Sequence, residues 1–413
     1  MGAGRSRSPG RADLPVELRA DLRDGVDVVD ARGLRVVPGF IDLQCNGGFG
    51  VDLATEPERL WEVAAALPAT GVTAWLPTII SSPTEVRARA LAALRSGPPG
   101  GGRGDGSGVR PGDRGAAPDG PDGPRPGATP LGLHLEGPLL SPERPGAHPA
   151  ELLRRPGDED VEVGAWSRAS GVALVTLAPE LPGALDVVRR LVDQGVVVSA
   201  GHSSATAAEA EAAVDAGVRW VTHLFNAMAP LHHREPGLAG VALADERLRV
   251  GMIADGVHVH PTALAAAARA LGDRLTLVTD AVAALGLPPG PVRLGRAQAW
   301  ADETSVRLAD GTLAGSNLSL DRAIRTVAGL GVGARRSGPE GRPAADGPPG
   351  RPSADALAAA VRAASTTPAA VLGLTDRGVI APGAVGDLVL LDDLGTVVAT
   401  IVGGRVVYDR RRA

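Results

Sequence analysis

The chain alternates between short apolar runs and amphipathic segments over most of its length. The apolar runs have the length of β-strands and are rich in Val, Leu and Ile, and several end on a polar residue. They lie at residues 40–44, 73–78, 131–137, 173–180, 196–202, 220–226, 250–256 and 275–281. Near-continuous apolar strands of this kind predict an α/β fold with a parallel sheet that is buried on both faces.

Ala- and Leu-rich segments with helical spacing fill most of the gaps between these runs. Examples lie at residues 57–71, 84–97, 184–195, 206–217 and 261–273, and several end on glycine, as helix C-termini prefer. Eight strand–helix units in roughly 250 residues predict a closed (β/α)8 TIM barrel. An open doubly wound sheet is the alternative, but the GxGxxG turn typical of it is absent from the sequence.

The two ends of the chain predict a second, smaller unit. Residues 378–409 contain short strands separated by Gly and Asp turns, and residues 26–39 resemble a partner strand. We therefore expect a small β-sandwich-like appendage built from both chain ends. The expected division is 1–37 for a polar leader and part of the appendage, 38–375 for the catalytic barrel, and 376–413 for the rest of the appendage.

Two segments inside the expected barrel have a different composition. Residues 96–129 and 335–352 consist mostly of Gly, Pro, Asp, Arg and Ala. Such segments bury too little apolar surface to offset the entropy of ordering them, so we predict two disordered insertions.

The overall composition excludes several function classes. The formal net charge is -5, and there is no long basic run, so nucleic acid is not an expected partner. The single cysteine, Cys45, excludes an internal disulfide and fits a reducing compartment. Since no apolar run has the length of a signal peptide or a membrane span, we expect a cytoplasmic protein without membrane contact.

Polar side chains stand where the predicted strands end, and the carboxyl ends of barrel strands share one rim. These residues are Gln44, Asn46, Glu136, His202, His223, Asp255, His258 and Asp280. Each alone has an ordinary explanation as a packing or capping residue. Together they are better explained by a metal site, because a buried unpaired carboxylate or imidazole is costly.

Glu136, His202 and His223 are the candidate metal ligands. Two imidazoles and one carboxylate leave a coordination position open for water, as in catalytic zinc sites. Asp280, at the end of the last predicted strand, is the candidate proton shuttle between that water and a leaving group.

The motifs in this order resemble the amidohydrolase superfamily and, within it, the N-acetylglucosamine-6-phosphate deacetylase family. The similarity covers residue 26 to the C-terminus outside the two insertions. The matching stretches are PGFIDLQCNGG (38–48), HLEGP (134–138), GAH (146–148), AGHSSA (200–205), THLFNAM (222–228), REPGLAG (234–240), IADGVHV (253–259), LVTDA (277–281) and GTLAGS (311–316).

The resemblance implies hydrolysis of the acetamide of N-acetylglucosamine 6-phosphate, in amino-sugar catabolism and cell-wall sugar recycling. It implies that His148 polarises the acetamide carbonyl and that Arg234 binds the phosphate, partly across the interface of a homodimer. It also implies one divalent metal ion, with Zn²⁺ preferred and Fe²⁺ or another divalent ion as alternatives. The implied substrate-binding set is Ala147, Asn226, Ala227, Arg234, His258, Ala314, Gly315 and Ser316.

The motif after the first predicted strand differs from that of many superfamily members. Where those carry His-x-His and a second metal, this chain has Gln44 and Asn46. Neutral amides are poor ligands for transition metals, so we predict a single-metal site. Two alternative functions remain: another amidohydrolase reaction on an N-acyl amino acid or a cyclic amide, and a non-catalytic barrel that binds a sugar phosphate.

Overall fold

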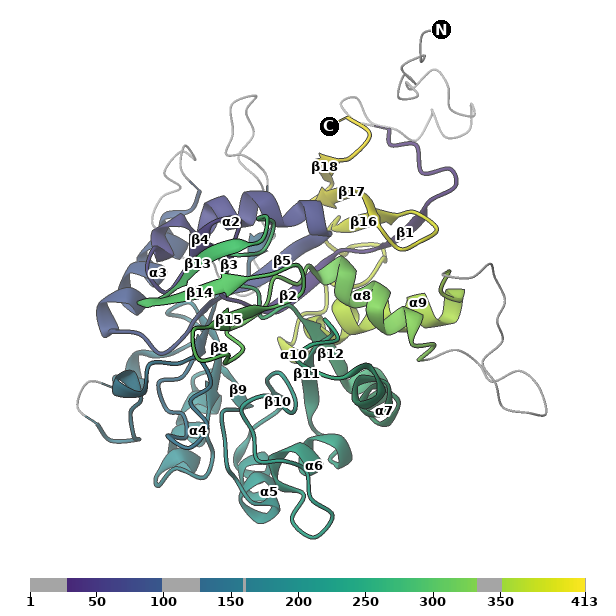
Figure 1. Ribbon diagram of the computed structural model, residues 1–413. Helices are drawn as coiled ribbons and strands as arrows, with labels where there is room; N and C mark the ends of the chain where they lie inside the picture. The colour runs from purple at the N-terminus through teal and green to yellow at the C-terminus, as the bar shows by residue number, and fades with distance from the viewer. Residues whose placement is uncertain (1–27, 99–126, 159–160, 333–350, 413) are drawn as a thin grey trace, which may run out of the picture.

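In the computed structural model, which describes residues 28–98, 127–158, 161–332 and 351–412, a parallel β-barrel forms the centre of the molecule (Figure 1). Its strands follow the order β12-β11-β10-β9-β8-β7-β5-β2, and β6 (Thr129–Pro130) adds to β5. The eight strands are β2 (Phe40–Cys45), β5 (Val72–Ile79), β7 (Leu133–Glu136), β8 (Val172–Leu177), β9 (Val197–Ala200), β10 (Trp220–Val221), β11 (Arg249–Ile253) and β12 (Leu275–Val278).

The barrel closes between its first and last strands. The backbone N–H of Asp280 donates to Gln44 O at 2.9 Å, and that of Asn46 donates to Ala281 O at 2.7 Å. These bonds lie just beyond the C-terminal end of β12, at the rim where the expected site residues stand. The predicted TIM barrel is therefore confirmed as a nearly closed eight-stranded barrel.

Helices cover the outside of the barrel and bury its strands. The strands are almost entirely buried, because each faces the barrel interior on one side and a helix on the other. The helices are α2 (Leu60–Ala66), α3 (Thr84–Ser96), α4 (Ala184–Asp193), α5 (Ala207–Ala216), α6 (Gly237–Ala244), α7 (Pro261–Leu271), α8 (Leu320–Gly329), α9 (Ala354–Ala364) and α10 (Thr366–Val371).

The two chain ends form a separate antiparallel sheet, as predicted. Its order is β1-β16-β17-β18, and β1 (Arg35–Pro38) pairs with β16 (Leu388–Leu391). The remaining strands are β17 (Val397–Val402) and β18 (Arg405–Asp409). Thr400 of β17 donates its hydroxyl to Pro68 O at 2.7 Å, so this sheet is attached to the barrel beside β5.

A three-stranded sheet that the sequence patterns did not predict follows the last barrel strand. It consists of β13 (Gly290–Leu294), β14 (Ala297–Ala301) and β15 (Val306–Leu308). Its inner residues pack with Val282, Ala314 and Ala147 at the barrel mouth. A β3–β4 hairpin (Gly47–Gly48 and Val51–Asp52) lies next to it, because Asp52 accepts the N–H of Gly295 at 2.6 Å.

Several predicted elements are shorter than expected. The segment 57–71 forms two 3₁₀ turns around α2, because Pro68 cannot continue an α-helix. The run 220–226 pairs only at Trp220–Val221, after which the chain turns at His223 and Phe225 with positive φ angles. Residues 96–98 and 127–129 of the first predicted insertion have described structure, and the rest of that insertion lies outside the described residues.

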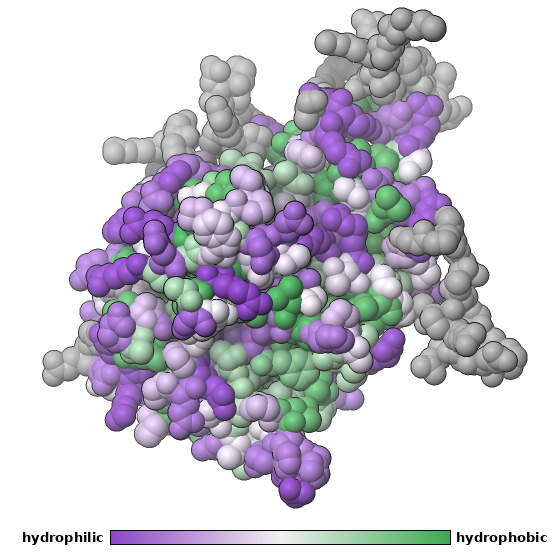
Figure 2. Space-filling view, in the orientation of Figure 1, coloured by the Kyte–Doolittle hydropathy of each residue, from purple (hydrophilic) through white to green (hydrophobic). Residues whose placement is uncertain are grey.

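The face in Figure 2 is mixed in character. Hydrophilic residues predominate around α2 and α3, and hydrophobic residues gather in the lower centre of the view (Figures 1 and 2). Among the described residues, no helix is long and apolar enough to cross a bilayer.

Candidate metal centre and active site

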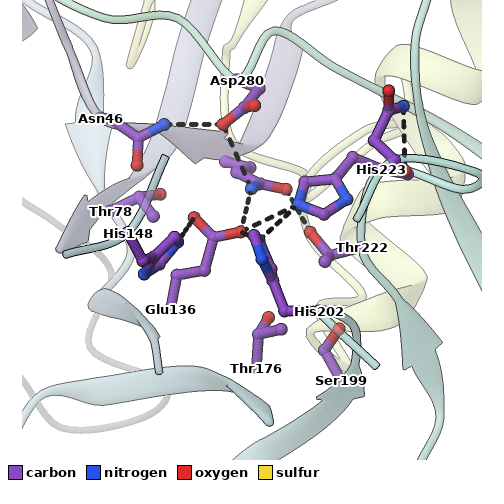
Figure 3. A network of polar contacts seen from close by, with 12 residues as sticks. Asn46, Thr78, Glu136, His148, Thr176, Ser199, His202, Thr222, His223 and Asp280 are labelled. Carbon is purple, nitrogen blue, oxygen red and sulfur yellow. Dashed lines mark hydrogen bonds and ion pairs between the residues drawn. The ribbon is translucent and has the colours of Figure 1, made fainter. Parts of the chain in front are cut away.

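Glu136 lies at the centre of a buried polar cluster at the barrel mouth (Figure 3). Its Oε1 is 3.2 Å from His202 Nε2 and 3.1 Å from His223 Nε2, and the two imidazole nitrogens are 3.0 Å apart. The three residues come from the ends of β7, β9 and β10, which are far apart in the sequence. The structure therefore brings the three predicted ligands together.

The backbone is held in an unfavourable conformation where these side chains enter the site. His202, His223 and Asp280 have φ angles of 50°, 27° and 50°, each two residues past the end of its strand. For L-residues the left-handed region costs roughly 1–2 kcal/mol per residue. Such conformations persist only where the surrounding structure imposes them, and they cluster at functional sites.

The spacing of the three donor atoms fits a tetrahedral metal ion. Ligand atoms about 2.1 Å from a tetrahedral ion lie about 3.4 Å from each other, close to the separations found here. The charges point the same way. Burial raises the pKa of Glu136, but the contacts with His202 and then His223 outweigh it, so this pKa falls well below its usual value. Burial lowers the pKa of His223, but the contact with Glu136 outweighs it, so this pKa rises. The cluster therefore favours positive charge at its centre.

His148 lies on the other side of Glu136, with its Nε2 3.8 Å from Oε2. The potential metal-binding group formed by Glu136, His148 and His202 thus overlaps the predicted one. Hydrogen bonds distinguish the two histidines. His202 Nδ1 is 3.0 Å from Arg144 O, and a carbonyl only accepts, so Nδ1 carries the proton and Nε2 has a free lone pair.

His148 has the opposite arrangement. The backbone N–H of Ser81 donates to His148 Nδ1 at 3.2 Å, so in the neutral ring the proton sits on Nε2. Burial and the nearby charge of His202 lower the pKa of His148 to about 3, which keeps the ring neutral near pH 7. His148 therefore presents an N–H donor to the site instead of a lone pair.

Asp280 stands on the far side of the cluster from His148. Its Oδ1 accepts from Asn46 Nδ2 at 2.7 Å and from Gln44 Nε2 at 3.2 Å. The same Gln44 nitrogen donates to Glu136 Oε1 at 2.8 Å, and the hydroxyl of Thr222 donates to Gln44 Oε1. Gln44 and Asn46 thus occupy donor positions that orient two carboxylates.

Asp280 has the electrostatic character of a general base. Burial, followed by the charge of Glu136, raises the pKa of Asp280 to about 6, although the charges of His223 and His258 and the hydrogen bond from Asn46 oppose the shift. A base with a pKa near the working pH combines a useful ionised fraction with a strong tendency to accept a proton.

The expected substrate-binding residues fall into two groups. Several line the barrel mouth beside the cluster: Ser316 N donates to Asp280 O at 2.8 Å, and Ala147 and Ala314 pack in one apolar cluster. Asn226 and Ala227 lie three and four residues after His223, and Ala227 also has a positive φ. His258 is 2.6 Å from Asp255 through Nδ1, and its charge acts on Asp280.

Arg234 is not joined to this cluster in the single chain. It lies on an exposed loop, where its Nη1 donates to His233 Nε2 at 2.8 Å.

Two buried residues of the site were not predicted from the strand ends, because they lie one layer deeper in the barrel. His134 is fully buried beneath Glu136, and its Nε2 is 2.8 Å from Thr176 Oγ1. Asp42 is also fully buried and accepts from Thr279 Oγ1 at 2.6 Å. The available signal was the two-residue period of a strand, since His134 and Glu136, and likewise Asp42 and Gln44, share a face. Cys45, between Gln44 and Asn46, is buried in the core.

Comparisons with known proteins agree with this geometry. The sequence profile of the amidohydrolase family matches residues 35–407. The N-acetylglucosamine-6-phosphate deacetylase of Danio rerio is 36% identical over 393 residues, covering 92% of this chain and 86% of the relative. The N-acetylgalactosamine-6-phosphate deacetylase of Escherichia coli O157:H7 is 36% identical over 311 residues, covering 74% and 75%.

A solved structure shows the same fold. It is a mutant of the N-acetyl-D-glucosamine-6-phosphate deacetylase of Mycobacterium smegmatis in complex with N-acetyl-D-glucosamine-6-phosphate. The TM-score is 0.75 at 34% identity, covering 91% of this chain and 87% of that one.

Proposed function

The chain belongs to the amidohydrolase family, and on this premise we propose that it is a metal-dependent N-acetylglucosamine-6-phosphate deacetylase. It hydrolyses the acetamide of N-acetylglucosamine 6-phosphate to glucosamine 6-phosphate and acetate. The observation that carries this proposal is the convergence of Glu136, His202 and His223 within 3.2 Å of each other, with Asp280 and His148 beside them. The deacetylase names of relatives that match most of the chain support the substrate.

Glu136, His202 and His223 would hold a single divalent ion, with Zn²⁺ as the first candidate. The donor set fits this ion, since imidazole and carboxylate are its usual protein ligands and His202 offers a free lone pair. When bound, the ion would supply Lewis acidity, which lowers the pKa of water toward neutrality. A second ion has no comparable ligands at the first strand, because Gln44 and Asn46 are neutral amides.

The protein groups divide the remaining chemistry between them. Asp280 accepts a proton from the attacking water and returns it to the amine, which has to leave protonated. His148 donates its Nε2–H to the carbonyl oxygen of the acetamide, where negative charge develops. Gln44 and Asn46 hold Asp280 in place through its Oδ1, so its other oxygen is available for proton transfer.

The sugar phosphate occupies the mouth of the barrel. Its lining consists of Ala147, Asn226, Ala227, His258, Ala314, Gly315 and Ser316. Arg234 binds the phosphate, since guanidinium and phosphate match in geometry. Because Arg234 lies on an exposed loop and donates to His233, the proposal includes a homodimer in which Arg234 binds the phosphate in the adjacent subunit. A cytoplasmic location fits a sugar-phosphate substrate.

The decisive test is the release of acetate from N-acetylglucosamine 6-phosphate by the metal-replete chain, with N-acetylgalactosamine 6-phosphate in parallel because one relative carries that name. The Asp280→Asn variant keeps the side-chain shape and is expected to lose about 10²–10⁴-fold in kcat with its metal content unchanged. Removing the metal with a chelator should abolish turnover, and adding Zn²⁺ back should restore it. A folded, metal-replete chain that releases no acetate from either sugar would overturn the proposal.

A further inference from the structure

Glu180 lies outside the buried polar cluster, in the loop between β8 and α4. Its carboxylate nevertheless makes two short hydrogen bonds to the residues that come directly after His202. Ser203 donates its hydroxyl to Oε2 at 2.7 Å, and the backbone N–H of Ser204 donates to Oε1 at 2.7 Å. Hydrogen bonds to an ionised acceptor are about twice as strong as neutral ones.

These bonds act on a strained part of the backbone. His202 has a φ of 50°, so the chain there does not adopt this conformation by preference. Its ring is fixed separately, because Nδ1 is held by the carbonyl of Arg144. Glu180 holds the peptide units that follow, and Arg144 sets the direction of the ring.

Backbone hydrogen bonds also connect the loop after His202 to the loop that follows His223. The backbone N–H of Ser203 donates to Ala227 O at 3.0 Å, and that of Ala229 donates to Ser203 O at 3.2 Å. Ser203 is fully buried, and its hydroxyl also accepts the N–H of Ala205 at 3.0 Å. Ser203 therefore connects Glu180 to the loop that carries His223, and a single carboxylate fastens both histidine loops.

We propose that Glu180 is a positioning residue that sets the metal affinity of the site by holding Ser203 and Ser204, and through them the left-handed conformation of His202. Glu180 takes no part in the chemical step. This inference rests on the proposed metal site and adds to it a residue from the loop after β8. Replacing a residue that orients a metal ligand without binding the metal usually lowers metal affinity about 10–100-fold.

The test measures metal affinity directly. Metal-free wild type and variants are titrated with Zn²⁺ against a chromogenic chelator, and circular dichroism checks that each is folded. Glu180→Ala should raise the dissociation constant about 10–100-fold. Glu180→Gln should stay within about fivefold of wild type, because an amide can still accept from Ser204 and donate to Ser203.

Two further variants separate positioning from general damage. Ser203→Ala removes the contact to Oε2 but leaves the one to Oε1, so it should weaken binding less than Glu180→Ala. Asp186→Asn is the matched control, since this carboxylate is 85% exposed on the neighbouring helix α4. At saturating Zn²⁺ the kcat of Glu180→Ala should approach that of the wild type, which a defect in the chemical step would not allow.

The outcomes distinguish this inference from the proposed function. If wild type binds Zn²⁺ and folded Glu180→Ala binds it equally well, the inference is wrong and the metal site stands. If Glu180→Gln is as impaired as Glu180→Ala, the hydrogen-bond explanation is wrong. A folded wild type that binds no divalent ion would remove both proposals.

Discussion

At the scale of single residues, the site works through the assignment of protons. His202 and His148 are chemically identical side chains on either side of Glu136, yet their neighbours give them opposite roles. The carbonyl of Arg144 leaves His202 with a lone pair for a metal, and the N–H of Ser81 leaves His148 with a proton to donate. Asp280 and Glu136 differ in the same way, because burial raises the pKa of Asp280 while the histidines keep that of Glu136 low.

The ionisation of Asp280 should set the pH dependence of turnover. Asp280 has to be ionised to accept a proton, and its pKa is raised to about 6. Activity should therefore be present above this value and fall as the pH decreases through about 6. His148, with a pKa of about 3, stays neutral over this range and adds no second limb. The profile of kcat against pH between 4.5 and 8.5, on the order of eight points, would measure this.

Residual turnover of Asp280→Asn is the control for that profile. It should be small and should lack the limb near pH 6, since an amide does not titrate. A limb that persists unchanged in this variant would assign the titration to another group.

At the scale of elements, the period of the apolar pattern revealed most of the fold. Strand runs and helical segments predicted the barrel, and polar residues at strand ends indicated Glu136, His202, His223 and Asp280. The sheet β13–β15 was missed because its strands alternate buried and exposed residues in runs of three to five, too short for a clear signal. Ser81, Arg144 and Glu180 were missed because they act through loop contacts that no local pattern encodes.

The contact between the first and last barrel strands should contribute to the stability of the fold. Asp42 on β2 accepts the hydroxyl of Thr279 at 2.6 Å, just after β12, where the two strands make few ladder bonds. Thr279→Val keeps the shape but leaves a fully buried carboxyl without this donor. The free energy of unfolding should fall by about 1–3 kcal/mol. Urea unfolding of the metal-free chain at pH 7 would measure the loss.

Thr262→Val is the matched control, because Thr262 is exposed in the first turn of α7. This surface change should stay within about 0.5 kcal/mol of wild type. Equal stabilities of the two variants would show that Asp42 does not depend on Thr279.

At the scale of the whole molecule, the barrel rim supplies the chemistry and the added sheets shape its surroundings. The sheet β13–β15 packs against Ala147 and Ala314 at the mouth of the barrel. The sheet built from both chain ends is fastened beside β5, away from the cluster. Arg234 lies on an exposed loop, and in the described part of the chain its guanidinium donates to its neighbour His233.

The last prediction therefore tests whether Arg234 serves a second subunit. Light scattering should give a mass about twice the 41.7 kDa of one chain. Arg234→Ala should mainly raise KM, and Asp280→Asn should abolish turnover. If the two variants are co-expressed with different tags and the hybrid dimer is isolated, one of its two sites has both an intact Asp280 and the partner's Arg234. Such a hybrid should recover about half of the wild-type activity per dimer. If Arg234 acts within its own chain, neither site is complete, and the hybrid should be no more active than the Arg234→Ala homodimer.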